Sequence, residues 1–171
     1  SKNSNVQDPP QKKLDSLISL YNQKKLQQVF EETQKLTKKY TKSVILWNLM
    51  GTSAAQIGQL DHAILACKKA LTIKPDDATT YNHMGGIIRK KGKLDEAINA
   101  FEKALSIKPD FAEAYYNMGN ALHDQDKPNE AIEAFQKALS LKPDFYQAYY
   151  NLGNSLEKHG KLDEAVEAYK K

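Results

Sequence analysis

The stretch AEAYYNMGNALHDQDKPNEAIEAFQKALSLKPDF, residues 112–145, decides the fold of this chain. The next stretch, residues 146–171, reads YQAYYNLGNSLEKHGKLDEAVEAYKK and repeats the same residue types 34 positions later. Towards the N-terminus the same interval separates the aromatic residues Trp47, Tyr81, Tyr115 and Tyr149. A fixed period of this length indicates a protein built from stacked structural repeats.

Each period carries two stripes of apolar or small residues at three- and four-residue steps. In residues 112–145 the stripes comprise Tyr115, Met118, Gly119 and Leu122, then Ala131, Ile132, Phe135, Ala138 and Leu139. Residues 126–129 interrupt the pattern, and Pro128 is tolerated there because it falls in the turn or the first helical turn. The second stripe ends before Pro143, since the residue before a proline disfavours helical geometry. Each period therefore predicts two amphipathic helices.

Small residues recur at positions where helices meet or turn. The turns of the other periods contain Gly58, Gly92 and Gly160, and three residues later come Asp61, Asp95 and Asp163. We expect these aspartates to be helix N-caps, which also suits the helix dipole. Gly119 on one helix and Ala131 on the next are expected to let two backbones approach. The rings of Tyr115 and Phe135 would fill the space beside them.

The order aromatic, apolar, Gly, Ala, aromatic, Ala, Pro resembles that of the tetratricopeptide repeat (TPR) family. The resemblance runs without insertion from Val44 to the end of the chain. It implies an all-α solenoid of stacked antiparallel helix pairs that forms a right-handed superhelix. The expected repeats are residues 44–77, 78–111 and 112–145, followed by a truncated repeat at 146–171.

The N-terminal residues fit the repeat less well. Residues 10–43 contain two helical stripes but lack the Gly, the Ala pair and the final Pro, so we interpret them as a degenerate capping repeat. Residues 1–9 are polar and are expected to be a disordered lead-in. Because Lys171 falls inside the second helix of a repeat, we also expect the native protein to continue beyond it.

Charge and composition restrict the kind of partner. Residues 1–43 hold nine Lys against four acids, whereas residues 44–171 hold 16 Lys or Arg against 17 acids. The intact repeats are nearly neutral, which argues against a nucleic-acid surface. No apolar run has membrane-spanning length and no signal-peptide pattern opens the chain, so we expect a cytoplasmic protein without a membrane partner. Cys67 stands where other repeats have Phe101, Phe135 or Tyr169, and we interpret it as a small core residue.

No arrangement of residues indicates an enzyme. The four histidines share no metal-ligand spacing, and neither a phosphate loop nor a nucleophile motif is present. We therefore predict a non-catalytic protein without cofactor or metal. Its expected function is a protein–protein interaction scaffold that binds an extended peptide or partner segment.

The resemblance also indicates where such a segment would bind. In TPR proteins the first helix of each repeat lines the concave groove, and on this chain the matching positions are Asn48, Thr52, Asn82, Arg89, Tyr116, Asn117, Asn120, Tyr150, Asn151 and Asn154. Tyr116 and Tyr150 each follow a core tyrosine, so we expect them to point away from the core as interface anchors. The asparagines supply both donors and acceptors for a peptide backbone.

Two further expectations concern partners. Residues 108–120, KPDFAEAYYNMGN, resemble repeats of O-linked N-acetylglucosamine transferase and its bacterial relatives, in which a ladder of asparagines holds protein substrates. The ladder is partial here, because His83 and Leu49 stand in place of Asn117. The alternative function is therefore the substrate-recruiting arm of a glycosyltransferase- or sulfotransferase-like enzyme. The apolar stripe of the last helix also predicts a weak homodimer formed by end-to-end stacking.

Overall fold

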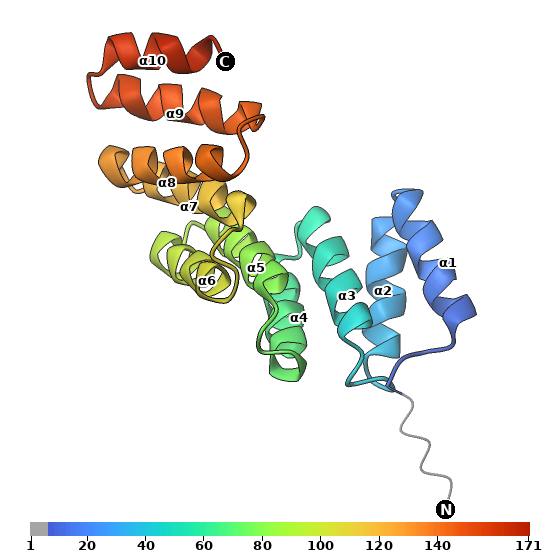
Figure 1. The fold of residues 1–171 in the computed structure, drawn as a ribbon. Coiled ribbons are helices and arrows are strands. Elements are labelled where there is room, and N and C mark those ends of the chain that lie inside the picture. The colour runs from blue at the N-terminus through green and yellow to red at the C-terminus, as the bar shows by residue number, and fades with distance from the viewer. Residues whose placement is uncertain (1–6) are drawn as a thin grey trace, which may run out of the picture. The chain divides into compact units, whose positions relative to one another are not determined.

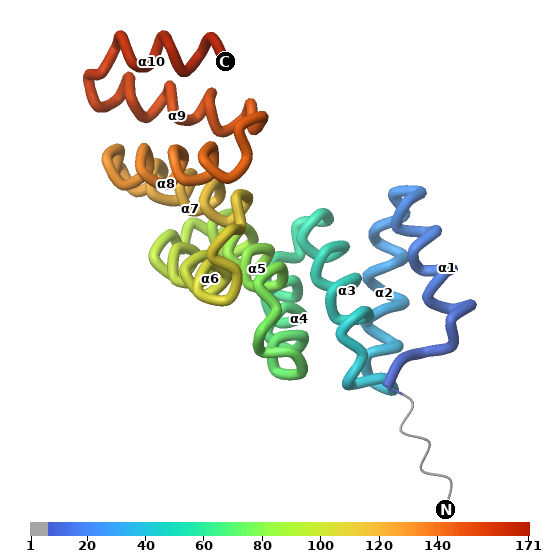
Figure 2. The backbone as a smooth tube through the Cα atoms, viewed as in Figure 1, coloured from blue at the N-terminus to red at the C-terminus, as the bar shows by residue number. Residues whose placement is uncertain are grey.

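A computed structural model describes residues 7–171, which form ten α-helices and no strand (Figures 1 and 2). The helices are α1 (Gln11–Asn22), α2 (Leu26–Leu36), α3 (Val44–Gln56), α4 (Leu60–Ile73), α5 (Ala78–Lys90), α6 (Leu94–Ile107), α7 (Ala112–Asp124), α8 (Pro128–Leu141), α9 (Tyr146–Lys158) and α10 (Leu162–Tyr169). The prediction of an all-α solenoid of helix pairs is confirmed. The chain divides into two compact units, Ser1–Thr80 and Tyr81–Lys171, which are described separately.

The first unit contains α1 to α4, and each helix packs against the next. Leu14 and Leu17 of α1 lie against Leu46 of α3, and all three are buried. The two stripes predicted in residues 10–43 are therefore a real helix pair, α1 and α2. Ser43 caps α3 by accepting a hydrogen bond from the backbone N–H of Leu46 at 3.3 Å.

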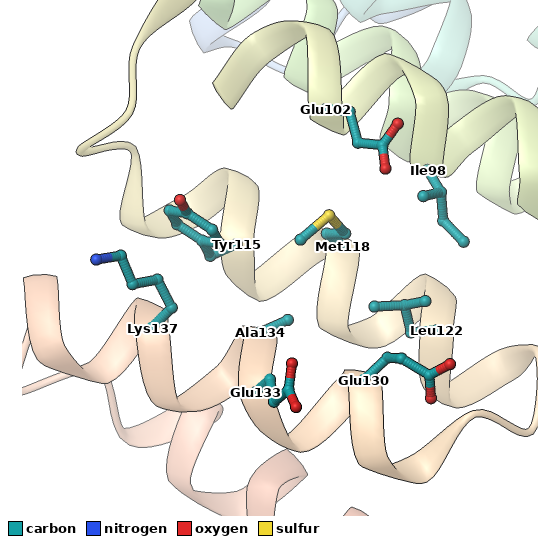
Figure 3. Close-up of a pocket in the computed structure, with 9 residues that line it drawn as sticks. All are labelled: Ile98, Glu102, Tyr115, Met118, Leu122, Glu130, Glu133, Ala134 and Lys137. Atoms are coloured by element: carbon teal, nitrogen blue, oxygen red, sulfur yellow. The ribbon is translucent and has the colours of Figure 1, made fainter. Parts of the chain in front are cut away.

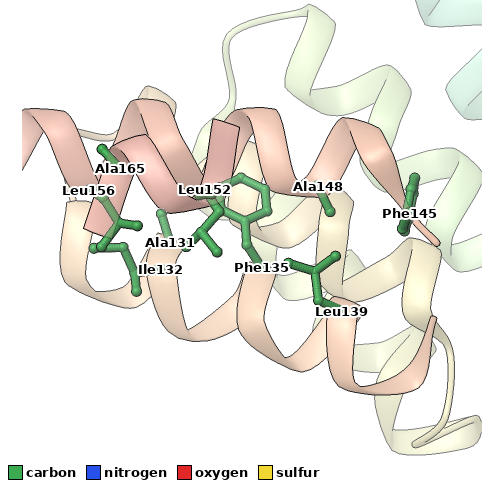
Figure 4. Packing of buried hydrophobic residues seen from close by; sticks show 10 residues of the cluster. Ala131, Ile132, Phe135, Leu139, Phe145, Ala148, Leu152, Leu156 and Ala165 are labelled. Carbon is green, nitrogen blue, oxygen red and sulfur yellow. The ribbon is translucent and has the colours of Figure 1, made fainter. Parts of the chain in front are cut away.

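The C-terminal part of the second unit contains a continuous apolar cluster from α8, α9 and α10 (Figure 4). Phe135 lies fully buried at its centre, and the half-buried rings of Tyr116 and Tyr149 pack against the cluster. Phe145 enters from the turn before α9. One repeat cannot bury such a face alone, so the stacking of successive pairs supplies the core.

The five turns inside the helix pairs share one geometry at the repeat interval. Their left-handed residues are Lys24, Gly58, Gly92, Asp126 and Gly160, with φ between 61° and 82°. In each turn the following N–H donates to the carbonyl five residues earlier, as in Lys25 to Leu20 at 3.0 Å and Lys127 to Leu122 at 3.0 Å. This bond satisfies carbonyls that a helix end leaves open. Lys24 shows that the first helix pair keeps the register of the later ones.

The expected aspartate N-caps are wrong. The N-cap residues are Gln59, Lys93 and Lys161, each two positions before the expected aspartate. The second helix of each pair begins directly after this residue, because the left-handed turn is short. Asp61, Asp95 and Asp163 lie in the first turn of their helices, without a capping role. Their negative charge still faces the positive end of the helix dipole.

The repeated glycine makes room for an aromatic ring. A Cβ atom on Gly119 would lie 2.7 Å from Cε1 of Phe135, and one on Gly85 would lie 2.6 Å from Cε1 of Phe101. The expectation that the ring of Phe135 lies beside Gly119 is confirmed. At Gly51 the corresponding neighbour is Cys67, whose Sγ would lie 3.5 Å away.

The predicted lead-in, residues 1–9, has contacts at its C-terminal end. Asp8 accepts a hydrogen bond from the hydroxyl of Ser43, and Pro9 is buried. Asp8 and Pro9 thus have contacts with the described fold, Asp8 at the N-cap residue of α3. Residues 1–6 lie outside the described residues.

Candidate functional site

A row of side-chain amides crosses the first helices of the second unit. It consists of Asn82 on α5, Asn117 and Asn120 on α7, and Asn151 and Asn154 on α9, and is called the amide row below. The side-chain N–H of Asn117 donates to the oxygen of Asn82 at 3.0 Å, and that of Asn151 donates to the oxygen of Asn120 at 2.7 Å. The five amides are half-buried. Neighbouring repeats are thus linked through their asparagines.

The amide row keeps unused hydrogen-bonding capacity. Within residues 7–171 the side-chain N–H groups of Asn82, Asn120 and Asn154 have no partner, and neither do the oxygens of Asn117 and Asn151. Each asparagine can donate two hydrogen bonds and accept two. The row therefore offers both donors and acceptors to a ligand, as an extended peptide backbone requires.

A charged pair lies at the C-terminal ends of α5 and α7. Arg89 Nε donates to Asp124 Oδ2 at 2.6 Å, and His123 Nδ1 lies 2.9 Å from the hydroxyl oxygen of Ser155 on α9. Arg89, His123 and Asp124 line a pocket of about 190 Å³ together with three members of the amide row, Asn120, Asn151 and Asn154. The structure thus brings six side chains from three helices around one small polar pocket.

The two tyrosines expected to be interface anchors, Tyr116 and Tyr150, differ in how exposed their side chains are. Tyr150 has 62% of its surface exposed, in agreement with the prediction that it points away from the core. Tyr116 is half-buried, with its ring centre 4.7 Å from that of Phe145 and 6.0 Å from that of Phe135. The prediction is wrong for Tyr116, because Phe145, the N-cap residue of α9, covers its ring. Its hydroxyl still reaches the amide row, accepting from Asn151 at 3.2 Å.

Two predicted residues, Asn48 and Thr52, belong to α3 in the first unit. The Thr52 hydroxyl donates to the Asn48 backbone carbonyl at 2.8 Å, so its proton is used within the helix. The Asn48 side-chain oxygen accepts from the Thr80 hydroxyl at 3.4 Å. These two residues therefore offer fewer open groups than the amide row does.

His83 follows Asn82 of the amide row on α5. Burial lowers the pKa of His83 below its ordinary value, and the positive charge of Lys90 lowers it further. The imidazole is therefore neutral at neutral pH and can both donate and accept hydrogen bonds.

Two side chains near the site were missed by the sequence analysis. Tyr146 is 67% exposed and lies one helical turn before Tyr150, so the four-residue spacing could have indicated it. Asp124 was not among the predicted binding residues. Its actual partner, Arg89, lies 35 residues away, close to the repeat interval.

Within residues 7–171 no helix is long and apolar enough to cross a membrane. The same residues contain no group of three His, Cys, Asp or Glu side chains placed to hold a metal ion.

Four segments of the chain match family models. Residues 44–77, 112–145 and 134–167 match models described as tetratricopeptide repeat, and residues 85–126 match one described as TPR repeat. The chain is a tetratricopeptide repeat protein. TPR proteins bind protein partners, and the general role of this one is that of a protein-interaction scaffold. Such scaffolds are typically non-catalytic.

Solved structures share this TPR fold. A crystal structure of MamA is 27% identical, with 89% of each chain covered and a TM-score of 0.82. MamA from Desulfovibrio magneticus is 20% identical, covering 91% of this chain and 88% of its own, with a TM-score of 0.83. The pilF protein of Pseudomonas aeruginosa is 18% identical, covering 92% of this chain and 72% of its own, with a TM-score of 0.81. At their low identities the last two show the fold alone. No curated protein matches the chain.

Proposed function

We propose that this TPR protein binds an extended segment of a partner protein along the amide row. The observation that carries the proposal is the unused donor and acceptor capacity of five asparagines, four of which form two pairs across α5, α7 and α9. An extended segment presents its backbone N–H and C=O groups outward, and the row can pair with both. The exposed ring of Tyr150 adds an apolar anchor beside the row.

The polar pocket supplies a second element of specificity. The Asp124 carboxylate already neutralises Arg89, so the pocket is not an open anion site. Its asparagines and His123 favour an uncharged polar side chain of the partner segment. Tyr116 has a different role, because its ring packs on Phe145 and its hydroxyl holds Asn151 in place.

Peptide binding should depend on Tyr150 and Asn120. Peptides of about 12 residues, selected from a random display library on the intact chain, should bind Tyr150→Ala and Asn120→Ala more weakly by about 1–3 kcal/mol, the range of interface anchors. Asn99→Ala is the matched control, since Asn99 is an exposed asparagine on α6 outside the row. Dissociation constants from titration calorimetry measure the effect, and circular dichroism checks that helicity is intact.

The binding proposal fails if the selected peptides bind both variants as tightly as they bind the parent chain. An equal loss in Asn99→Ala would also count against it, because the loss would then be unrelated to the row. The alternative of a recruiting arm for a downstream transferase stays a prediction. It requires the same amide row, and the reading frame beyond Lys171 would test it.

We also propose weak end-to-end self-association through α10. Leu162 and Val166 have 62% and 50% of their surface exposed on one stripe of this helix, and Tyr169 lies beside them. Exposed apolar stripes on a helix favour association. Sedimentation velocity should show concentration-dependent dimers that Leu162→Gln/Val166→Gln abolishes. A chain that stays monomeric at millimolar concentration would show the proposal to be wrong.

A further inference from the structure

A second surface of the second unit has the form of an apolar groove. Tyr115, Met118 and Leu122 of α7 form its floor, between α6 and α8 (Figure 3). It encloses about 400 Å³ and is called the α8 groove below. These floor residues occupy a different face of α7 from Tyr116, Asn117 and Asn120, so the groove does not share the amide row.

The rim of the α8 groove is mainly acidic. Glu102 of α6 lies on one side of the floor, and Glu130 and Glu133 of α8 lie on the other (Figure 3). Within residues 7–171 none of these three carboxylates has an ion-pair partner. The cation on the rim, Lys137, lies at the end of the floor marked by Tyr115.

A related groove recurs one repeat later, with the uncharged Gln136 in the position of Glu102. A groove of about 440 Å³, called the α10 groove, has Tyr149, Leu152 and Leu156 as its apolar floor. Its rim contains Asp163, Glu164 and Glu167 on α10, with Lys171 in the position of Lys137. Glu164 and Glu167 pair with the exposed lysines Lys161 and Lys170, which flank α10, and such pairs contribute little.

Helix packing does not require these acids. The positions of Glu130 and Glu133 are occupied by His62 and Leu65 in residues 44–77, which form the same kind of helix pair. The chain as a whole carries a formal net charge of +4, yet each groove has three carboxylates against one lysine. In residues 78–111 the same two positions hold Glu96 and Asn99, so both glutamates occur together only in residues 112–145 and 146–171.

We propose that the α8 and α10 grooves together dock a basic, amphipathic segment of a partner protein. Its apolar side chains enter the two floors, and its Lys or Arg side chains contact the carboxylates of the rims. The charge of the rims selects this occupant, because carboxylates that are unpaired or only weakly paired beside an apolar floor attract cations and repel acidic or nucleic-acid ligands. Lys137 and Lys171 lie at corresponding ends of the grooves and set the direction of the segment.

Docking of a basic probe should depend on the rim of the α8 groove. The probe is a fluorescein-labelled peptide of Leu and Lys, about 14 residues long or about 21 Å as a helix. Its fluorescence anisotropy with the intact chain gives the dissociation constant. We expect Glu130→Gln/Glu133→Gln to weaken binding about tenfold, because two charge-assisted contacts are lost. The control Asp110→Asn/Asp144→Asn changes the net charge equally at exposed sites outside the grooves and should leave binding within about twofold.

Further measurements distinguish binding at the α8 groove from binding at the amide row. A peptide with Ser in place of Leu should lose most of its affinity, and Asn120→Ala/Tyr150→Ala should leave binding of the Leu–Lys peptide unchanged. Equal affinity for the rim variant and the control variant would overturn the proposal, as would a loss confined to the amide-row variant. If the rim variant instead abolished self-association of the chain in sedimentation, the occupant would be a second copy, and the proposed partner would be wrong.

Discussion

Replacing Phe135 by alanine should lower the free energy of unfolding of the second unit by about 4 kcal/mol, the middle of the range for buried Phe→Ala changes. Phe135 is fully buried and contacts the cluster formed by α8, α9 and α10. Its ring also covers Gly119, so truncation removes contacts with both helices of its pair. Urea denaturation followed by circular dichroism measures the loss.

The exposed neighbour Gln136 provides the control for this change. Gln136→Ala should alter the free energy of unfolding by no more than about 0.5 kcal/mol, as is usual for surface positions. A loss below about 1 kcal/mol for Phe135→Ala would mean that the neighbouring helices collapse into the vacated space. The cluster would then be less rigid than its packing indicates.

Adding a single methyl group at Gly119 should destabilise the second unit by about 2 kcal/mol, the usual size of an overpacking effect. The new Cβ atom would lie 2.7 Å from Cε1 of Phe135, and that ring is fully buried, so ring and helix must shift apart. Gly51→Ala is the matched control at the equivalent position of the first unit. There the nearest atoms, including Cys67 Sγ, lie at 3.5 Å, so alanine should instead stabilise the helix by up to about 1 kcal/mol.

A double mutant identifies the ring as the cause. In Gly119→Ala/Phe135→Ala the new methyl group no longer meets an aromatic ring, so the two losses should not add. We expect the double variant to be no less stable than Phe135→Ala alone, which is a coupling of about 2 kcal/mol. Additive losses would show that the effect of Gly119→Ala comes from the backbone of α7.

Much of the fold could be predicted from the sequence, because one period fixes both the helices and their stacking. The interruption at residues 126–129 and the proline at Pro143 mark the ends of α7 and α8 to within a residue or two. Lys24 could not be identified as a left-handed turn residue, since nothing in its side chain favours that geometry. The φ of 61° at Lys24 and the hydrogen bond from the Lys25 N–H to the Leu20 carbonyl identify the turn.

The candidate site could be predicted less well. The positions of the asparagines follow from helical periodicity, but their pairing across helices depends on how far one repeat is displaced from the next. The burial of Tyr116 depends on Phe145, a residue outside its own helix pair. The α8 groove is lined by residues of three helices. The periodicity of one helix predicts which residues share its face, but not which residues of other helices lie beside them.

Cys67, which packs beneath Gly51, gives the first unit a built-in chemical reporter. Burial raises the pKa of this thiol to about 12, so at neutral pH it is protonated as well as shielded. Only the thiolate reacts with alkylating reagents. Modification must therefore wait until α4 separates from α3, and its rate follows the population of that opened state. Because the chain has no second cysteine, the rate of iodoacetamide labelling reports local unfolding of the first unit alone.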